Sequence, residues 1–178
     1  MTVDRRRVSR CRLVRSAAAL LCLLAALAPA AHAATRGPST KEERDKAVQL
    51  TTMLESTPWS EEAPAARQWL MSFLSEAPDL TVKRCLSLFG APSERTGIPA
   101  EVLDQQLFSG AAHNFQHADE SPGSTGTFVA GLRGALAAYS AWRAHGGLDA
   151  VPRLDALVKI DKDGQLEAYV RERGRNCR

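Results

Sequence analysis

The chain has 178 residues, of which 44% are hydrophobic, and a formal net charge of +3 at pH 7. Six Arg and one Asp lie in residues 1–33, which leaves 17 Lys and Arg against 19 Asp and Glu in residues 34–178. The positive balance therefore belongs to the N-terminal segment 1–33. The rest of the chain lacks the basic patch with interleaved aromatic residues that a nucleic-acid partner would need, so we expect none.

The N-terminal segment 1–33 has the three parts of a secretory signal peptide. A head rich in Arg is followed by an unbroken apolar run over Ala17–Ala28, and residues 31–33 have the sequence A-H-A. We expect cleavage after Ala33, with Ala30 as the alternative position. An uncleaved membrane anchor is disfavoured, because a span needs about 20 apolar residues and this run stops at Pro29.

This pattern divides the chain into a signal peptide (1–33), a disordered N-terminal stub (34–40) and a single helical domain (41–178). The domain is long enough to bury about two thirds of its unfolded surface. The expected location is the periplasm or the medium, with no membrane attachment after signal cleavage.

Apolar residues recur with helical spacing along nearly the whole chain. The first two helices are marked by capping residues and prolines. Thr40 and Glu43 have the spacing of a capping box, which predicts a helix start, and Pro58 ends that helix. The next helix is expected to begin near residues 60–62 with Pro64 in its first turn, and to close at Pro78.

A short helix is predicted between Asp79 and Gly90. Its apolar positions recur at i, i+3, i+4 and i+7, and Gly90 is a favourable residue just past a helix end. Residues 91–98 are expected to form a loop. A longer helix follows from Pro99 to about Ala118, and its broad apolar face comprises Val102, Leu103, Leu107, Phe108, Ala111, Ala112 and Phe115.

The remaining sequence predicts a loop over residues 119–126 and three further helices. The first is capped by Thr125 or Thr127 and ends at Gly146, and the others cover residues 148–160 and 165–173. Inside the first, Gly131 and Gly134 each cost about 1 kcal/mol relative to Ala, which indicates close approach of a neighbouring helix or of a ligand. Helix packing is the simpler explanation. The whole pattern predicts an all-α protein, a single bundle of six or seven short amphipathic helices.

Two cysteines, Cys85 and Cys177, follow the expected cleavage site. An even number of cysteines in an exported chain favours one disulfide, and two buried free thiols are the alternative. The bridge would close a long loop, which the chain-entropy model values at about 4–5 kcal/mol. Cys85 falls on the inner face of the predicted short helix, so the bridge would tie that helix to the end of the chain.

The segment HNFQH, residues 113–117, is a candidate metal site. His113, His117 and Glu120 could supply two imidazoles and a carboxylate to zinc. A zinc-protease motif needs Glu directly after the first His, but Asn114 occupies that position. The distance from Phe115 around the helix places His113 toward solvent, so a solvated face is the simpler interpretation of this segment.

Trp59 lies between a proline and the expected start of the second helix. It suits a hydrophobic staple at that helix N-terminus, or an exposed aromatic contact for a partner. The sequence contains no G-x-S-x-G motif and no glycine-rich loop after a strand. We therefore assign neither a catalytic residue nor a cofactor.

The stretches APDLTVKRC (77–85) and LDAL…GQLEAYV…C (154–177) resemble those of uncharacterised secreted helical proteins of Gram-negative bacteria. The resemblance covers roughly residues 60–178. It implies export, a helical fold and a bridged cysteine pair, and it carries no catalytic residues.

These observations predict an exported, non-catalytic binding or interaction module, such as a periplasmic inhibitor or an immunity-type protein with a protein partner in the cell envelope. One alternative is a metal-binding protein or metal-dependent enzyme that uses His113 and His117. Another is a helical small-molecule carrier with a cavity near Gly131 and Gly134. The sequence does not indicate an oligomeric state.

Overall fold

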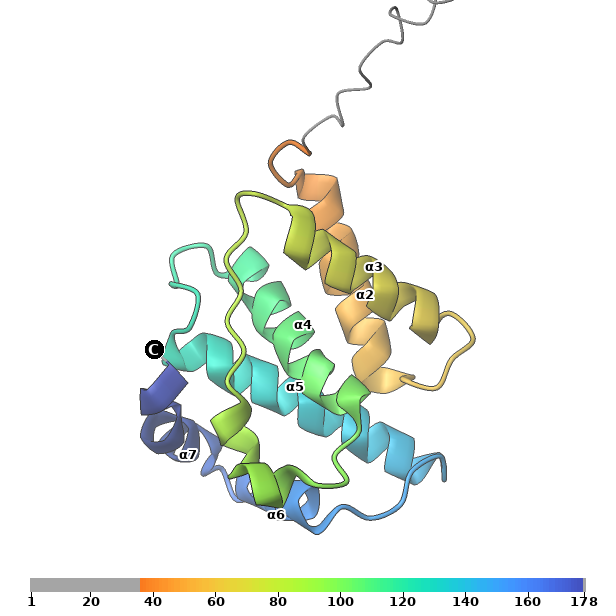
Figure 1. The fold of residues 1–178 in the computed structure, drawn as a ribbon, viewed down its shortest axis with the longest axis vertical. Helices are drawn as coiled ribbons and strands as arrows, with labels where there is room; N and C mark the ends of the chain where they lie inside the picture. The colour runs from red at the N-terminus through yellow and green to blue at the C-terminus, as the bar shows by residue number, and fades with distance from the viewer. Residues whose placement is uncertain (1–35, 178) are drawn as a thin grey trace, which may run out of the picture. The chain divides into compact units, whose positions relative to one another are not determined.

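The computed structural model describes residues 36–177, and every regular element in that part is helical. Six α-helices and three short 3-10 helices occur there without a strand, so the all-α prediction is confirmed (Figure 1). No helix among these residues is long and apolar enough to cross a bilayer. The predicted signal peptide, its cleavage site and the first two residues of the predicted stub lie outside the described residues.

The first two helices, α2 (Lys41–Ser56) and α3 (Ala63–Glu76), form one core with α4. The predicted capping box begins α2, because the Thr40 hydroxyl accepts the Glu43 N–H at 3.2 Å and the Glu43 carboxylate accepts the Thr40 N–H at 2.9 Å. Pro64 lies in the first turn of α3, where its missing N–H has no helical partner to lose.

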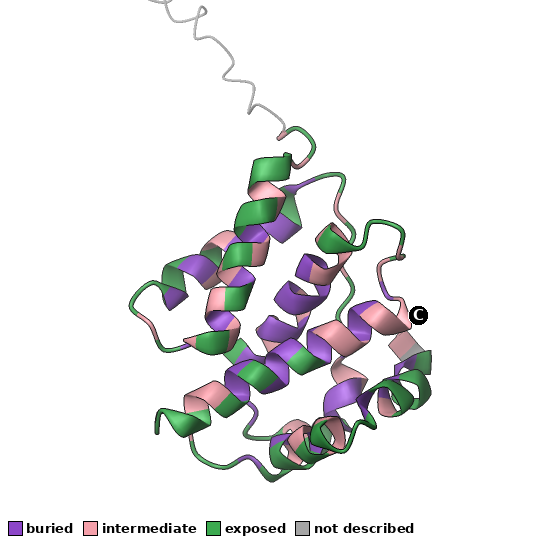
Figure 2. Ribbon diagram, turned by 180° about the vertical axis from the view of Figure 1, so that it is seen from behind, coloured by how far each residue is buried: buried purple, intermediate pink, exposed green. Residues whose placement is uncertain are grey.

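The helices α4 (Ala100–Gln116) and α5 (Thr125–Ala144) form the most extensive helix pair, and α2 packs against both of them. Burial is greatest along these two helices (Figure 2). The N-cap of α5 is Ser124, whose hydroxyl accepts the Thr127 N–H at 3.0 Å, rather than either threonine expected from the sequence.

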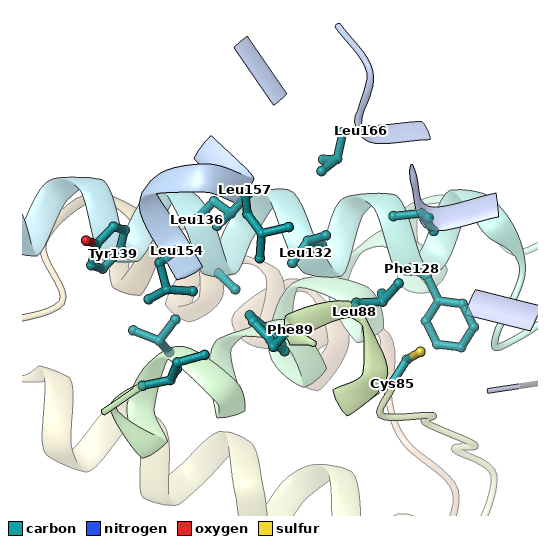
Figure 3. Packing of buried hydrophobic residues seen from close by; sticks show 14 of the residues in the cluster. Cys85, Leu88, Phe89, Phe128, Leu132, Leu136, Tyr139, Leu154, Leu157 and Leu166 are labelled. Carbon is teal, nitrogen blue, oxygen red and sulfur yellow. The ribbon is translucent and has the colours of Figure 1, made fainter. Parts of the chain in front are cut away.

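The chain ends in α6 (Pro152–Lys162) and α7 (Leu166–Arg173), which pack against α5. Figure 3 shows leucines of α6 lying over the row formed by Leu132, Leu136 and Tyr139 of α5. The start of α6 is four residues later than predicted. Val151 precedes the helix instead of belonging to it, and its N–H donates to the Tyr139 hydroxyl at 2.9 Å.

The predicted short helix over residues 79–90 is wrong except at its end, where Leu86–Phe89 form a 3-10 helix, η2. The chain before η2 is irregular because a side chain of α4 binds its backbone. The Gln106 amide oxygen accepts the Cys85 N–H at 3.3 Å, and the amide nitrogen donates to the Cys85 carbonyl at 3.0 Å. A second 3-10 helix, η3 (Pro92–Arg95), lies within the predicted loop.

The disulfide between Cys85 and Cys177 is present, as predicted. It spans 92 residues of sequence and joins the start of η2 to the last 3-10 helix, η4 (Gly174–Cys177). Cys85 is completely buried in the core around α5, whereas Cys177 is half-buried beside it. The bridge therefore fastens the end of the chain to the core.

At Gly131 the backbone of α5 lies so close to the backbone of α4 that it leaves no room for a side chain. A Cβ there would lie 2.6 Å from the Gln106 carbonyl oxygen, which belongs to a helix and cannot move aside cheaply. We expect Gly131→Ala to lower the free energy of unfolding by about 1–2 kcal/mol, because an overpacking cost of about 1–3 kcal/mol exceeds the gain in helix propensity. Urea denaturation followed by circular dichroism measures it.

Gly110→Ala on the facing helix is the matched control. A Cβ there would meet its nearest atom, the Thr127 carbonyl oxygen, at 3.4 Å, which is ordinary contact. This variant should be neutral or more stable by up to about 1 kcal/mol. Equal stabilities for the two variants would contradict the proposed close approach at Gly131.

Residues 36–40, which belong to the segment predicted as a stub, contact α2, α3 and the loop after α3. The Arg36 guanidinium forms an ion pair with Glu43 at 2.7 Å and lies over the Phe73 ring. The Asp79 carboxylate accepts both the Ser39 N–H and the Ser39 hydroxyl, each at 2.7 Å. The ordered domain thus begins before α2.

Asp79 is expected to make stability depend on acid pH. Hydrogen bonds from Ser39, together with one from Arg44, lower the pKa of its carboxyl from 3.8 to about 2. A carboxyl whose pKa is lower in the folded state stabilises above its unfolded pKa and loses that contribution as pH falls through the folded one. The difference in the free energy of unfolding between the parent protein and Asp79→Asn should therefore become smaller as the pH falls from about 4 to 2.

Urea denaturation at several pH values tests this expectation. Asp149→Asn is the control, because Asp149 is exposed and forms neither a hydrogen bond nor an ion pair in the described structure. A gap for Asp79→Asn that stays constant over this pH range would show that the Ser39 contacts do not hold the carboxylate in its charged form.

Candidate functional site

A groove of about 400 Å³ lies where α2, α4 and α5 meet. Each helix contributes one wall through residues spaced three or four apart, so the same face of each helix turns toward the groove. Its lining comprises Val48, Thr51, Thr52, Glu55, Ser109, Ala112, His113, Gln116, Ala130, Arg133, Gly134 and Ala137.

A chain of hydrogen-bonded polar groups connects α2 and α4 at the groove. The Ser109 hydroxyl donates to Glu55 Oε1 at 2.6 Å, and Gln105 Nε2 donates to Ser109 Oγ at 3.0 Å and to the Thr51 carbonyl at 3.3 Å. Gln105 and Thr51 are each 2% exposed. These hydrogen bonds hold the carboxylate of α2 against the surface of α4.

Gly134 of α5 makes room for this arrangement. A Cβ at that position would collide with the Ser109 hydroxyl and with Glu55 Oε1. The two glycines singled out in the sequence therefore have different roles. Gly131 lies against helix backbone, and Gly134 lines the groove.

The charge of Glu55 is not compensated within the domain. Among residues 36–177, no Lys, Arg or His side chain forms an ion pair with it. Arg133, the cation on the opposite wall, pairs instead with Asp161 at 3.1 Å. The groove is thus lined by a half-buried carboxylate without a counter-ion among the described residues.

Two polar atoms of groove residues are buried without a hydrogen-bond partner, Thr51 Oγ1 and His113 Nε2. His113 Nε2 nevertheless lies 3.3 Å from Glu120 Oε1, which makes an ion pair when the imidazole is protonated. The Thr51 hydroxyl is thus the buried groove atom for which the described residues supply no partner.

His113 does not face solvent as the helix spacing predicted. Its side chain is 19% exposed and lies in the groove, because α5 and the loop before it cover this side of α4. The rings of His113 and His117 lie 4.2 Å apart, so the structure does bring the candidate metal residues together.

The third of these residues, Glu120, is engaged at the start of α5. It accepts the Ser124 hydroxyl at 2.7 Å, and this hydrogen bond is the main cause of the lowered pKa of its carboxyl. In the described part of the chain, no three His, Cys, Asp or Glu side chains are grouped as a metal ion would require.

Trp59 stacks on His145, the C-cap residue of α5, with ring centroids 4.1 Å apart and planes inclined by 4°. The contact links the loop between α2 and α3 to the end of α5. The indole is 36% exposed and is the most exposed large hydrophobic side chain of the described residues. Its surface therefore stays available as a partner contact.

No family model, curated protein or solved structure matches the chain. The site must accordingly be interpreted from its own residues. Sequence reasoning missed Glu55 and Ser109 because each belongs to a different helix and neither stands in a motif. One signal was present: Gln105 and Ser109, four residues apart, interrupt the apolar face of α4.

Proposed function

We propose that the protein is an exported, non-catalytic binding protein that acts in the periplasm or outside the cell, as inhibitors and immunity-type proteins do. The signal-like segment 1–33 and the disulfide support export, since disulfides persist in oxidising compartments.

The groove between α2, α4 and α5 carries the binding part of the proposal. Glu55 is a half-buried carboxylate without an ion-pair partner among the described residues, and a bound cation would supply one. The groove volume of about 400 Å³ lies within the range of small-ligand sites. This volume agrees with the carrier form of a binding protein.

The state of Ser109 supports a role without catalysis. Its hydroxyl donates to Glu55, and within the described residues it forms no hydrogen bond with the imidazole of His113. A serine nucleophile needs an adjacent base that takes its proton and a third group that orients that base. These contacts instead fix the hydroxyl as a structural donor to the carboxylate.

The test is to isolate the exported protein under native conditions and to identify what it retains. The protein carrying its own signal is recovered from the periplasmic fraction and the medium, and native mass spectrometry and affinity isolation then detect bound small molecules and proteins. We expect a retained molecule that is lost from Glu55→Gln and kept by Glu42→Gln, an exposed carboxylate of the same helix. Recovery only in the cytoplasm, or no retained molecule at all, would contradict the proposal.

A further inference from the structure

We propose that the groove between α2, α4 and α5 binds a primary ammonium ion with a short alkyl body, and that Glu55 is its counter-ion. The inference depends on the proposed binding function and names the ligand class for that site. Three observations carry it: the uncompensated carboxylate, its second oxygen without a hydrogen bond, and the apolar walls of the groove.

The charge of Glu55 favours a cation as the ligand. Glu55 is half-buried, and its Oε1 accepts one hydrogen bond from the neutral hydroxyl of Ser109. An ion pair with a bound cation gains strength where water is partly excluded. An anionic ligand would be repelled by the same carboxylate, and the positive charge of Arg133 on the groove wall is partly offset by its ion pair with Asp161.

A neighbouring hollow lacks this imbalance of charge. That hollow, lined in part by Lys41, Arg44 and Asp45, is of similar size. There Lys41 pairs with Asp45 at 2.5 Å, and Arg44 pairs with Asp79 at 2.8 Å. Its charged groups are neutralised by one another, so it offers no free counter-ion to a ligand.

The groove also presents a hydrogen-bond acceptor that suits an ammonium group. An ammonium group has three donors and no acceptor, so its site must present oxygen atoms or other acceptors. Among the described residues, Glu55 Oε2 accepts no hydrogen bond, so it can accept one from a bound ammonium group.

The walls of the groove are partly apolar, which favours a ligand with an alkyl body. Val48, Ala112 and Ala130 line the groove beyond the carboxylate, one from each helix. Small apolar side chains leave room for a short alkyl chain and favour its burial, because apolar surface removed from water contributes about 25 cal/mol per Å². The site therefore suits an amine with an alkyl body better than an inorganic cation, which would gain nothing from these walls.

The direct test titrates butylamine into the full disulfide-bonded protein and follows binding by calorimetry and by NMR shifts of groove residues. We expect saturable binding to the parent protein, at least tenfold weaker binding to Glu55→Gln, and unchanged binding to Glu42→Gln. The two variants have the same net charge, so their comparison removes general electrostatic attraction. The glutamine at position 55 retains an oxygen that can accept the Ser109 hydroxyl, which preserves the fold.

Further ligands and variants test the ligand class and the place of binding. Butanol and butyrate, of similar size but neutral and anionic, should bind at least tenfold more weakly than butylamine. Ala130→Leu should block the groove, whereas Ala141→Leu, a half-buried alanine elsewhere on α5, should leave binding unchanged. Circular dichroism verifies that every variant is folded.

Absence of saturable butylamine binding to the folded parent protein would overturn the ammonium site. Equal binding to the Glu55→Gln and Glu42→Gln variants would overturn it as well. Either result would leave the broader binding function standing if the exported protein retained a molecule in a Glu55-dependent manner. Loss of that retention as well would reject both proposals.

Discussion

Replacing Cys177 by Ser is expected to lower the melting temperature of the oxidised protein by roughly 10–15 °C. The disulfide closes a loop between residues 92 apart, and the chain-entropy model values a loop of that length at about 4–5 kcal/mol. For a domain of this size each kcal/mol corresponds to about 3 °C. Differential scanning calorimetry or thermal circular dichroism gives the shift.

Cys177 is the better position for this test because it is half-buried, whereas Cys85 is completely buried in the core. Serine at position 85 would also bury a hydroxyl, so its effect should be equal or larger. A reductant should lower the melting temperature of the parent protein and leave Cys177→Ser unchanged. Equal melting of parent and variant under oxidising conditions would mean that the bridge contributes nothing to stability.

Replacing Gln106 by Met is expected to lower the free energy of unfolding by about 2–3 kcal/mol. The side chain is 2% exposed, and its amide binds both the N–H and the carbonyl of Cys85. Methionine has a similar size but no such donor or acceptor, so the buried N–H loses its partner at a cost of about 1–3 kcal/mol. The Cys85 carbonyl keeps one hydrogen bond, from the Leu88 N–H at 3.2 Å.

Urea denaturation of the oxidised protein measures the effect, and Gln68→Met is the control because Gln68 is exposed on α3. We expect the control to lie within about 0.5 kcal/mol of the parent. Amide exchange adds a local measurement, since the Cys85 N–H should exchange faster in Gln106→Met. Unchanged stability and unchanged exchange would show that the amide contact does not fix the backbone before η2.

Predictions succeeded where the contacts that form a segment are local in the sequence. The start of α2 was predicted correctly because its capping box lies within four consecutive residues. The helix predicted over residues 79–90 failed, although its apolar spacing was helical. There the backbone of Cys85 bonds to Gln106, which is 21 residues away, so a contact between distant segments overrode the local pattern.

The candidate site likewise depends on contacts between distant segments, which local patterns do not predict. Helix spacing placed His113 toward solvent, because the spacing describes one helix and contains no information about what covers its other faces. The groove needs Glu55 of α2, Ser109 of α4 and Gly134 of α5 at one place. No local pattern links these residues, and only the crossing of the three helices joins them.

The sequence by itself determined the helical class, most helix boundaries marked by capping residues or prolines, and the pairing of Cys85 with Cys177. These features depend on residues close in the chain, or on the fact that only two cysteines follow the segment 1–33. The tertiary structure alone decided the form of the segment before η2 and the burial of His113. It also placed an uncompensated carboxylate in a groove, because each of these results from side chains brought together by helix packing.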